Sequence, residues 1–248
     1  MKIIASDYDG TLNHGGIDDK KRAAIKKWRD SGNIFAIVSG RGIKDALDIL
    51  KKDNLEIDYF VATNGAIILN SKGEKVSDIK CDGDIAKPLL DMLFECGCTW
   101  GCVLTDFPCV IYADKSKCKE NGEYTLENTP LISYFNQIST SLPDYETAEK
   151  VTATIKENFG NYVNPLQNGT CIDIVRCDID KAKGIYLLLE ILNAKYEDVI
   201  AVGDNINDIA MIKEFRSYAM DNGVEIIKKM ANNTIGSVTE LIDKELQR

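Results

Sequence analysis

The sequence has only one histidine, His14, and its Asn-His-Gly-Gly setting is typical of an exposed loop. A Ser-His-Asp catalytic arrangement needs a histidine that is held firmly between its two partner groups. Because the chain has no second histidine and the first is expected in a loop, we exclude that arrangement.

The paired C-x-x-C spacing of structural zinc sites is also absent, although the chain has eight cysteines. Cys96, Cys98 and Cys102 are close in sequence and could bind a soft metal, but the single histidine is remote from them. We expect no signal peptide, because Asp7 and Asp9 interrupt the first apolar run. The cysteines are therefore expected to be reduced and to pack as small apolar residues.

Basic residues are in the minority: 30 lysines and arginines stand against 39 aspartates and glutamates, for a formal net charge of −9. Since nucleic-acid grooves are built from Lys and Arg, this balance disfavours nucleic acid as the main partner. No apolar run reaches the roughly 18 residues that a membrane span needs. We expect a cytoplasmic protein without nucleic-acid or membrane partners, as a monomer or a small homo-oligomer.

Apolar runs alternate with amphipathic segments near both ends of the chain. The runs at residues 33–38, 58–62 and 199–202 are typical of strands buried on both faces, and helical patterns follow them. This alternation predicts a parallel sheet with right-handed crossovers. Between about residues 81 and 176 the strand-like runs have few crossovers, which predicts a mainly antiparallel sheet with helices on one face. Residues 114–144 read as an irregular polar stretch.

The expected fold class is therefore α/β: a Rossmann-like, doubly wound parallel sheet with an inserted α+β cap domain. Residues 1–81 and 179–248 would form the core domain, and residues 82–178 the inserted domain.

Two carboxylates, Asp7 and Asp9, follow the first strand-like run. Side chains alternate along a strand, so two acids two residues apart at its end can be aimed at one point. Gly10 allows a sharp turn there, and Thr11 adds a hydroxyl. Two acids this close repel each other unless a cation or a shared proton offsets them, and oxygen ligands suit Mg²⁺.

Three further loops of small polar residues follow strand-like runs, at residues 39–41, 63–65 and 203–205. The carboxyl ends of parallel strands lie along one edge of the sheet, where ligands bind. Asp204 is the natural third metal ligand at that edge, and Asp208, one helical turn later, could face the same site. Ser39 and the Gly40 amide, expected at a helix N-terminus, could hold an anion.

Each of these groups also has a simpler explanation. Ser39 could be a plain N-cap, and so could Asp204 or Asn205. Lys181 could be a solvated lysine at the start of a helix, or a cation aimed at a phosphate and a carboxylate. Taken one motif at a time, the residues leave these alternatives open.

As a set, the motifs resemble those of haloacid dehalogenase (HAD) superfamily phosphatases of the Cof-type subfamily, over nearly the whole chain. The resemblance rests on Asp-x-Asp-Gly-Thr at 7–11, Ser-Gly-Arg at 39–41, Asn-Gly-Ala at 64–66 and Gly-Asp-x-x-Asn-Asp at 203–208. The family lysine lies eight residues after the aspartate of an Asp-Ile pair; counting from Asp173 gives Lys181, with Lys183 as the rival. The chain is somewhat short for the subfamily, in the inserted segment and around residues 232–236.

The resemblance implies a Mg²⁺-dependent phosphatase acting on a small phosphorylated metabolite, with an aspartyl-phosphate intermediate. Asp7 would be the nucleophile, Asp9 the general acid and base, and Lys181 a cation that stabilises developing charge. The inserted domain would be a cap that closes over the site and sets specificity. The implied metal residues are Asp7, Asp9 through its backbone carbonyl, Asp204 and Asp208, the last orienting the shell together with Asn207. The implied substrate or phosphate contacts are Thr11, Ser39, Gly40, Arg41, Asn64 and Asn207.

Two rival functions are weighed against hydrolysis. A phosphosugar mutase of the same superfamily must hold a second phosphate, which favours several arginines, and residues 82–178 contain only Arg176. A non-catalytic sugar-phosphate sensor would not need the complete acid set at positions 7, 9, 204 and 208. Sugar phosphates are the favoured substrates by resemblance, with nucleotide, flavin and pyridoxal phosphates as alternatives.

Overall fold

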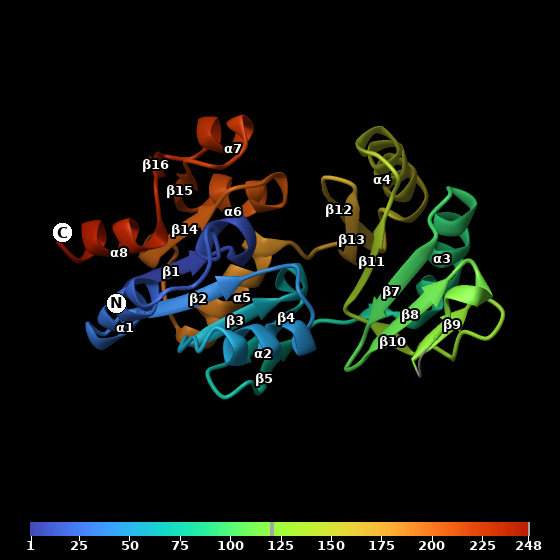
Figure 1. The fold of residues 1–248 in the computed structure, drawn as a ribbon, viewed down its shortest axis with the longest axis horizontal. Coiled ribbons are helices and arrows are strands. Elements are labelled where there is room, and N and C mark those ends of the chain that lie inside the picture. Colours follow the sequence, from blue (N-terminus) through green and yellow to red (C-terminus); the bar gives the residue numbers. More distant parts are fainter. Residues whose placement is uncertain (120–121, 248) are drawn as a thin grey trace. The chain divides into compact units, whose positions relative to one another are not determined.

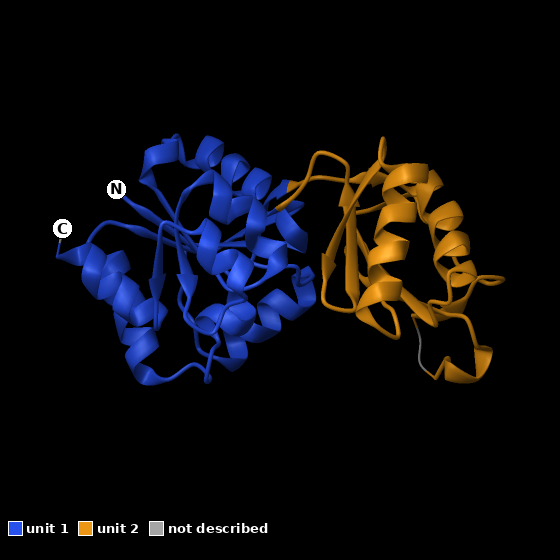
Figure 2. Ribbon diagram, turned by 90° about the horizontal axis from the view of Figure 1, so that it is seen from above, with its two compact units in different colours: residues 1–77, 181–248 blue, residues 78–180 orange. Residues whose placement is uncertain are grey.

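The computed structural model describes residues 1–119 and 122–247, which form two compact units. Residues 1–77 and 181–248 make up unit 1, and residues 78–180 make up unit 2 (Figure 2). The chain thus leaves unit 1 once and returns to it once. The inserted domain expected at residues 82–178 falls within unit 2, and its independence as a domain stays a prediction.

Unit 1 is built on one eight-stranded sheet (Figure 1). Its strands, in order across the sheet, are β16 (Asn233–Ile235), β15 (Arg216–Met220), β14 (Val199–Gly203), β1 (Ile3–Ser6), β2 (Ile34–Val38), β3 (Tyr59–Ala62), β4 (Ile67–Asn70) and β5 (Lys75–Asp78). The pairs from β16 to β3 are parallel, and β4 is antiparallel to β3. The predicted α/β fold class, with a large and mostly parallel sheet, is confirmed.

Helices cover both faces of this sheet. They are α1 (Asp19–Asp30), α2 (Ile43–Lys52) and α8 (Val238–Leu246) on one face, and α5 (Lys181–Leu192), α6 (Ile209–Glu214) and α7 (Glu225–Met230) on the other. Each face of the sheet packs against its helices through a layer of apolar side chains. Successive strand residues point into the two layers in turn, because side chains alternate along a strand. Ile4 belongs to the first layer and Ile3 to the second, and both are fully buried. The sheet is therefore doubly wound.

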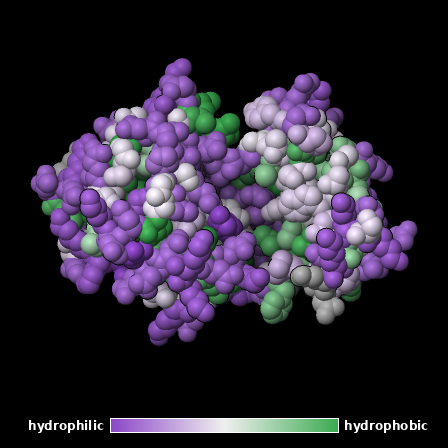
Figure 3. All heavy atoms as spheres, viewed as in Figure 1, coloured by the Kyte–Doolittle hydropathy of each residue, from purple (hydrophilic) through white to green (hydrophobic). Residues whose placement is uncertain are grey.

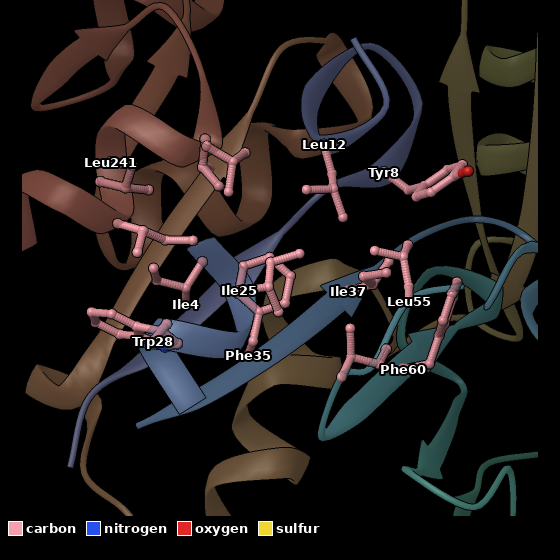
Figure 4. Close-up of a cluster of buried hydrophobic side chains, with 14 of the residues drawn as sticks. Ile4, Tyr8, Leu12, Ile25, Trp28, Phe35, Ile37, Leu55, Phe60 and Leu241 are labelled. Carbon is pink, nitrogen blue, oxygen red and sulfur yellow. The ribbon is translucent and has the colours of Figure 1, made fainter. Parts of the chain in front are cut away.

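In the first layer, which lies between the sheet and helices α1, α2 and α8, single side chains fix the two ends of α1. The apolar side chains of this layer come from the central strands and from α1 and α8 (Figure 4). Asp18 caps α1 by accepting a hydrogen bond from the Lys21 amide at 2.9 Å. Trp28, near the other end of α1, is fully buried and donates its indole N–H to the Ile34 carbonyl at 2.7 Å. The helix is thereby fixed to the start of β2.

Unit 2 contains a second, six-stranded sheet with two helices on one face (Figure 2). Its strands, in order, are β12 (Val163–Asn168), β13 (Cys171–Arg176), β11 (Gln137–Ser141), β7 (Trp100–Leu104), β8 (Pro108–Tyr112) and β9 (Glu123–Thr125). All pairs are antiparallel except β8 with β9. The helices α3 (Ala86–Glu95) and α4 (Tyr145–Phe159) bury one face, and β6 (Cys81–Asp82) pairs with β10 (Tyr134–Phe135).

The expected irregular stretch at residues 114–144 is a wrong prediction, because it contains β9, β10 and β11. Strand β11 pairs with β13 on one side and β7 on the other, so it is central to the sheet. It has only one apolar residue, Ile138; the buried Thr140 instead donates its hydroxyl to the Trp100 carbonyl at 2.6 Å. Residues 120 and 121 of this stretch lie outside the described residues.

The surface agrees with the composition. Hydrophilic residues cover most of the face seen in Figure 3, with apolar residues scattered among them. In the part of the chain that the structure describes, no helix is both long enough and apolar enough to cross a bilayer.

Candidate active site

Four neighbouring parallel strands, β14, β1, β2 and β3, each end in one of the polar loops singled out in the sequence. Asp204 follows β14, Asp7 follows β1, Ser39 follows β2 and Thr63 follows β3. Hydrogen bonds connect the loops: the Thr63 amide donates to the Arg41 carbonyl at 2.9 Å, and the Asn64 amide donates to the Ser39 carbonyl at 3.0 Å. The loops therefore form one continuous site at the carboxyl edge of the sheet.

Lys181 lies at the centre of this site. Its Nζ is 2.7 Å from Asp7 Oδ1 and 2.6 Å from Asp208 Oδ1, and the residue has 0% exposure. Position 181 is the first residue of α5, so the helix start directs the ammonium group into the site. The alternative of a solvated lysine is wrong for this residue. Lys183, the rival, is only partly buried.

Asp208 holds the Asp204 loop in shape. Its Oδ2 accepts hydrogen bonds from the amides of Asp204, at 2.9 Å, and Asn205, at 3.2 Å, while Oδ1 binds Lys181. A side chain at position 203 would collide with this carboxylate, since an added Cβ would lie 2.5 Å from Oδ2. This contact explains the glycine before Asp204.

The capping role at this loop falls to Asn205 and not to Asp204. The Asn205 side chain accepts a hydrogen bond from the Ile206 amide at 2.8 Å. The Asp204 carboxylate turns instead toward the first motif, where Thr11 Oγ1 donates to its Oδ1 at 2.5 Å. Asp204 thus faces the same point as Asp7.

Asp7, Asp204 and Asp208 each offer one oxygen, and these three oxygens lie within 4.8 Å of one another. Among the described residues this is the only group of three or more acidic, cysteine or histidine side chains with that spacing, so Cys96, Cys98 and Cys102 form none. All ligand atoms are hard oxygens, which fit Mg²⁺. Because both oxygens of Asp208 are already hydrogen-bonded, Asp7 and Asp204 are the better-placed ligands.

The electrostatics favour a cation at the same point. Burial, and then the neighbouring Asp208 carboxylate, raise the pKa of Asp7 to about 8, although Lys181 opposes this. Burial also raises the pKa of Asp204. Burial disfavours the charge on Lys181, but Asp208 and Asp7 outweigh it and raise the pKa of that ammonium group. One lysine thus faces three carboxylates, and a divalent cation would balance the excess negative charge.

Comparison with known proteins agrees with this geometry. Residues 4–241 match the family model described as haloacid dehalogenase-like hydrolase. The chain belongs to this family. The predicted resemblance is therefore confirmed, and so is the expectation of an enzyme of this phosphatase superfamily.

Individual relatives of this HAD-like hydrolase align over nearly its full length. It is 26% identical over 235 residues to 5-amino-6-(5-phospho-D-ribitylamino)uracil phosphatase YcsE of Bacillus subtilis (strain 168), across 94% of this chain and 88% of that protein. It is 24% identical over 265 residues to the Escherichia coli (strain K12) phosphatase of the same description, YbjI, across 100% and 97%. A solved HAD/COF-like hydrolase from Plasmodium vivax is similar with a TM-score of 0.84 and 23% identity, across 100% and 96%.

Asp9 lies apart from the carboxylate cluster of the HAD-like hydrolase. Its side chain is 55% exposed, and its two oxygens accept hydrogen bonds from Arg41 Nε and Nη2, both at 2.8 Å. The Arg41 guanidinium also lies over the Tyr8 ring, 5.7 Å from its centre. Arg41, expected to contact the phosphate, is thus bound to Asp9 in this structure.

The expected position of Ser39 at a helix N-terminus is wrong. Helix α2 begins at Ile43 and its N-cap is Gly42, three residues after Ser39. Ser39 is buried, and its Oγ accepts a hydrogen bond from the Arg41 amide at 3.3 Å. The loop after the next strand, β3, also has an unusual backbone: Thr63 and Asn64 both have left-handed angles, with φ of 48° and 52°. The loop geometry is therefore specific to this edge and is not a plain helix cap.

Sequence reasoning missed Asn222. Its Nδ2 donates to the Gly10 carbonyl at 2.9 Å and so ties the β15–α7 loop to the first motif. The signal was present: Asp-Asn-Gly at residues 221–223 follows a strand that belongs to the same parallel series. Asn207, by contrast, is predicted from its motif, and it lies partly buried in the short turn before α6.

Proposed function

We propose that this HAD-like hydrolase is a Mg²⁺-dependent phosphatase that hydrolyses a small phosphate monoester through an aspartyl-phosphate on Asp7. The observation that carries the proposal is the buried Lys181 ammonium, held between the Asp7 and Asp208 carboxylates beside Asp204. The single positive charge of Lys181 cannot offset three neighbouring carboxylates, and buried charge that is left without compensation is costly. A divalent cation bound at this site would balance them.

In this proposal Asp7 attacks phosphorus in line with the leaving group. An Asp7 carboxylate oxygen forms a bond to phosphorus as the bond from phosphorus to the substrate oxygen breaks, and Asp9 donates its proton to that oxygen. Water then attacks phosphorus, Asp9 takes a proton from it, and the bond to Asp7 breaks. The exposed position of Asp9 suits an exchange of protons with substrate and water.

The cation would be held by the carboxylates of Asp7 and Asp204 and by the Asp9 backbone carbonyl. Asp208, through its bonds to Lys181 and to the Asp204 amide, would keep these ligands in place. When bound, Mg²⁺ would supply positive charge that attracts the phosphate oxygens.

The remaining charge on the phosphate would be met by Lys181 and by the Ser39–Gly40 segment, which hydrogen-bonds to the next loop through the Asn64 amide. Thr11, Asn64 and Asn207 are proposed as further contacts, on the strength of their motif positions and their place in the same group of loops. Arg41 could reach a phosphate only after releasing Asp9, so we propose it as a contact that forms during turnover.

For the substrate we propose a sugar phosphate or a related small metabolite. Two of the relatives above are named as phosphatases of 5-amino-6-(5-phospho-D-ribitylamino)uracil. This compound should therefore be tested directly after the sugar phosphates. We also propose that residues 82–178 are the inserted domain that governs which ester is accepted. Hydrolysis is favoured over a mutase because the single arginine there, Arg176, is paired with Asp178 at 2.6 Å.

The test is phosphate release from p-nitrophenyl phosphate, with and without Mg²⁺, by the wild type and by Asp7→Asn. We expect Mg²⁺-dependent release that the variant loses. A sensor would show no release in any condition, and equal rates for the two proteins would refute Asp7 as the nucleophile. A mutase would instead interconvert hexose 1- and 6-phosphates when primed with a bisphosphate. A panel of phosphate esters, with sugar phosphates first, then identifies the substrate.

A further inference from the structure

The loop between β15 and α7, residues 221–224, is hydrogen-bonded to two of the active-site loops at once. On one side, Asn222 Nδ2 donates a hydrogen bond to the Gly10 carbonyl at 2.9 Å. On the other side, the Val224 amide donates to the Asp204 carbonyl at 2.9 Å. The loop therefore connects the first motif to the last one from outside the carboxylate cluster.

The two connected loops also touch each other closely. Gly10 has a left-handed backbone with φ of 82°, and an added Cβ would lie 2.4 Å from Asp204 Oδ2. Thr11 Oγ1 donates to the other oxygen of the same carboxylate at 2.5 Å. The position of the Gly10 turn thus determines where the Asp204 carboxylate can lie.

The connecting loop has a firm base. It follows β15, which pairs with β14 and β16, and the Asp221 amide continues the pairing by donating to the Ile235 carbonyl at 3.0 Å. The Gly223 amide closes the turn on the Met220 carbonyl at 2.8 Å. Gly223 also packs against Asp204, since an added Cβ would lie 3.0 Å from the Asp204 carbonyl oxygen. Asn222 is thus held by the sheet and not by a mobile segment.

We propose that Asn222 is a positioning residue that sets the affinity for Mg²⁺ by holding the Gly10 turn against the Asp204 carboxylate. The inference rests on the proposed function, because it concerns the same cation site. Asn222 would touch neither the cation nor the substrate; it would act through the Gly10 carbonyl alone.

The reason is the strict geometry that Mg²⁺ requires. This ion binds at about 2.0–2.1 Å in a nearly ideal octahedron, so small shifts of the ligands weaken it. Groups that orient metal ligands typically change metal affinity by about 10–100-fold when they are removed. Without the Asn222 hydrogen bond, only the Thr11 side chain would still bond the Gly10 turn to the Asp204 carboxylate, and the spacing of the ligands proposed at positions 7, 9 and 204 would be less well fixed.

The competing explanation is that Asn222 only stabilises its own loop. The two explanations differ in what they predict for metal binding without substrate. A purely structural residue would lower the melting temperature and leave Mg²⁺ affinity unchanged. A positioning residue would weaken Mg²⁺ binding and have little effect on the metal-free protein, because Asn222 is exposed.

The experiment uses Asn222→Ala and Asn222→Leu, which remove the donor with and without loss of side-chain volume. The matched control is Asn158→Ala, which removes an equally exposed hydrogen bond from an asparagine to a backbone carbonyl, Asn158 Nδ2 to Thr154 at 3.0 Å in α4. Mg²⁺ affinity is measured by calorimetry without substrate, and the Mg²⁺ concentration for half-maximal activity is measured with p-nitrophenyl phosphate.

We expect both Asn222 variants to bind Mg²⁺ about 10–100-fold more weakly than the wild type and to regain most of their kcat at high Mg²⁺. The control should match the wild type. Unchanged Mg²⁺ affinity in the Asn222 variants, or an equal loss in the control, would overturn the inference alone. If the wild type itself neither binds Mg²⁺ nor depends on it, the proposed function fails as well.

Discussion

At the scale of single residues, Lys181 is a fully buried cation held between two carboxylates. Its charge is offset by Asp7 and Asp208, and neither carboxylate has another cation within salt-bridge distance among the described residues. Removing one partner of a buried ion pair is costly, because the remaining charges are left without compensation. This arrangement allows the identity of the family lysine to be tested directly.

Lys181→Met keeps the length of the side chain and removes its charge. We expect a loss of stability of about 3–5 kcal/mol in urea unfolding with EDTA present. Activity should fall by at least about 10²–10³-fold, as for the loss of one group that stabilises the transition state. Lys183→Met is the matched control and should keep most of the activity. If instead Lys183→Met were inactive and Lys181→Met active, the assignment would be reversed.

Asp7 provides a second prediction, on the pH dependence of metal stabilisation. Its pKa is raised from 3.8 to about 8 by burial in the metal-free protein. A raised folded pKa means that the folded state holds its proton more tightly, so this contribution to stability is complete below about pH 4 and is lost as the pH rises through about 8. Mg²⁺ binds the ionised form and should reverse this loss.

We therefore expect the increase in melting temperature on adding Mg²⁺ to grow steadily from about pH 5 to pH 9, relative to EDTA. The wild type and Asp7→Asn are compared by thermal unfolding at each pH. The variant, which lacks this titrating group, should show a smaller and flatter response. A stabilisation by Mg²⁺ that is largest at low pH would speak against Asp7 as a ligand.

At the scale of elements, the turn after β1 positions the first motif. Gly10 and Gly15 both have left-handed backbones, with φ of 82° and 72°, but only Gly10 has the Asp204 carboxylate against it. An added Cβ at Gly15 would have nothing within 4 Å. The two glycines therefore separate the effect of backbone strain from the effect of contact with the site.

Gly10→Ala and Gly15→Ala should each lose about 1–2 kcal/mol of stability from the left-handed backbone. Only Gly10→Ala should also lose activity and Mg²⁺ affinity, because its methyl group displaces the Asp204 carboxylate. Urea unfolding and metal titration of the two variants provide the comparison. Equal losses of activity in both would show that strain in the loop, and not contact with Asp204, is what matters.

The elements also show what a sequence can and cannot reveal. Strands β2, β3 and β14 were predictable because strands buried on both faces need continuous apolar runs. Strand β11 was not, because one of its faces carries two serines and a glutamine that have polar partners. Gln137 Nε2 donates to Ser139 Oγ at 2.8 Å, and Ser141 Oγ accepts a hydrogen bond from Trp100 Nε1 at 3.0 Å. A polar face of this kind has the composition of a loop.

In the candidate site, too, some features could be predicted from the sequence and others could not. The motifs predicted that Asp7, Asp204 and Asp208 lie close together, because a parallel sheet brings strand ends to one edge. Lys181 was expected beside them only from the spacing that the family resemblance implies, with Lys183 as the rival. The pairing of Arg41 with Asp9 and of Asn222 with Gly10 was not predictable, because both depend on the direction of a side chain across a tertiary contact. Spacing in sequence carries no information on that direction.

At the scale of the whole molecule, unit 1 holds every residue proposed for the chemistry, although these residues come from both ends of the chain. The intervening unit 2 has its own sheet and its own hydrophobic core. If the proposed roles hold, the residues for the chemical steps all belong to unit 1, and unit 2 can differ between relatives without removing them.

The central claim is that Asp7 carries the phosphoryl group and Asp9 moves the protons. Asp9→Asn should slow the hydrolysis of alkyl phosphates by about 10²–10⁴-fold, because general acid–base catalysis is lost. Nitrophenolate leaves without needing a proton, so p-nitrophenyl phosphate should still phosphorylate Asp7 in this variant. The second step still requires a base, and the phosphorylated enzyme should therefore accumulate.

The decisive measurement is rapid acid quenching of Asp9→Asn mixed with p-nitrophenyl phosphate and Mg²⁺, followed by mass spectrometry of the peptide that contains residue 7. We predict a burst of about one nitrophenolate per enzyme and one phosphoryl group on Asp7, both absent when Asp7→Asn is added to the variant. A burst without phosphorylation of Asp7, or phosphorylation of another residue, would contradict the account.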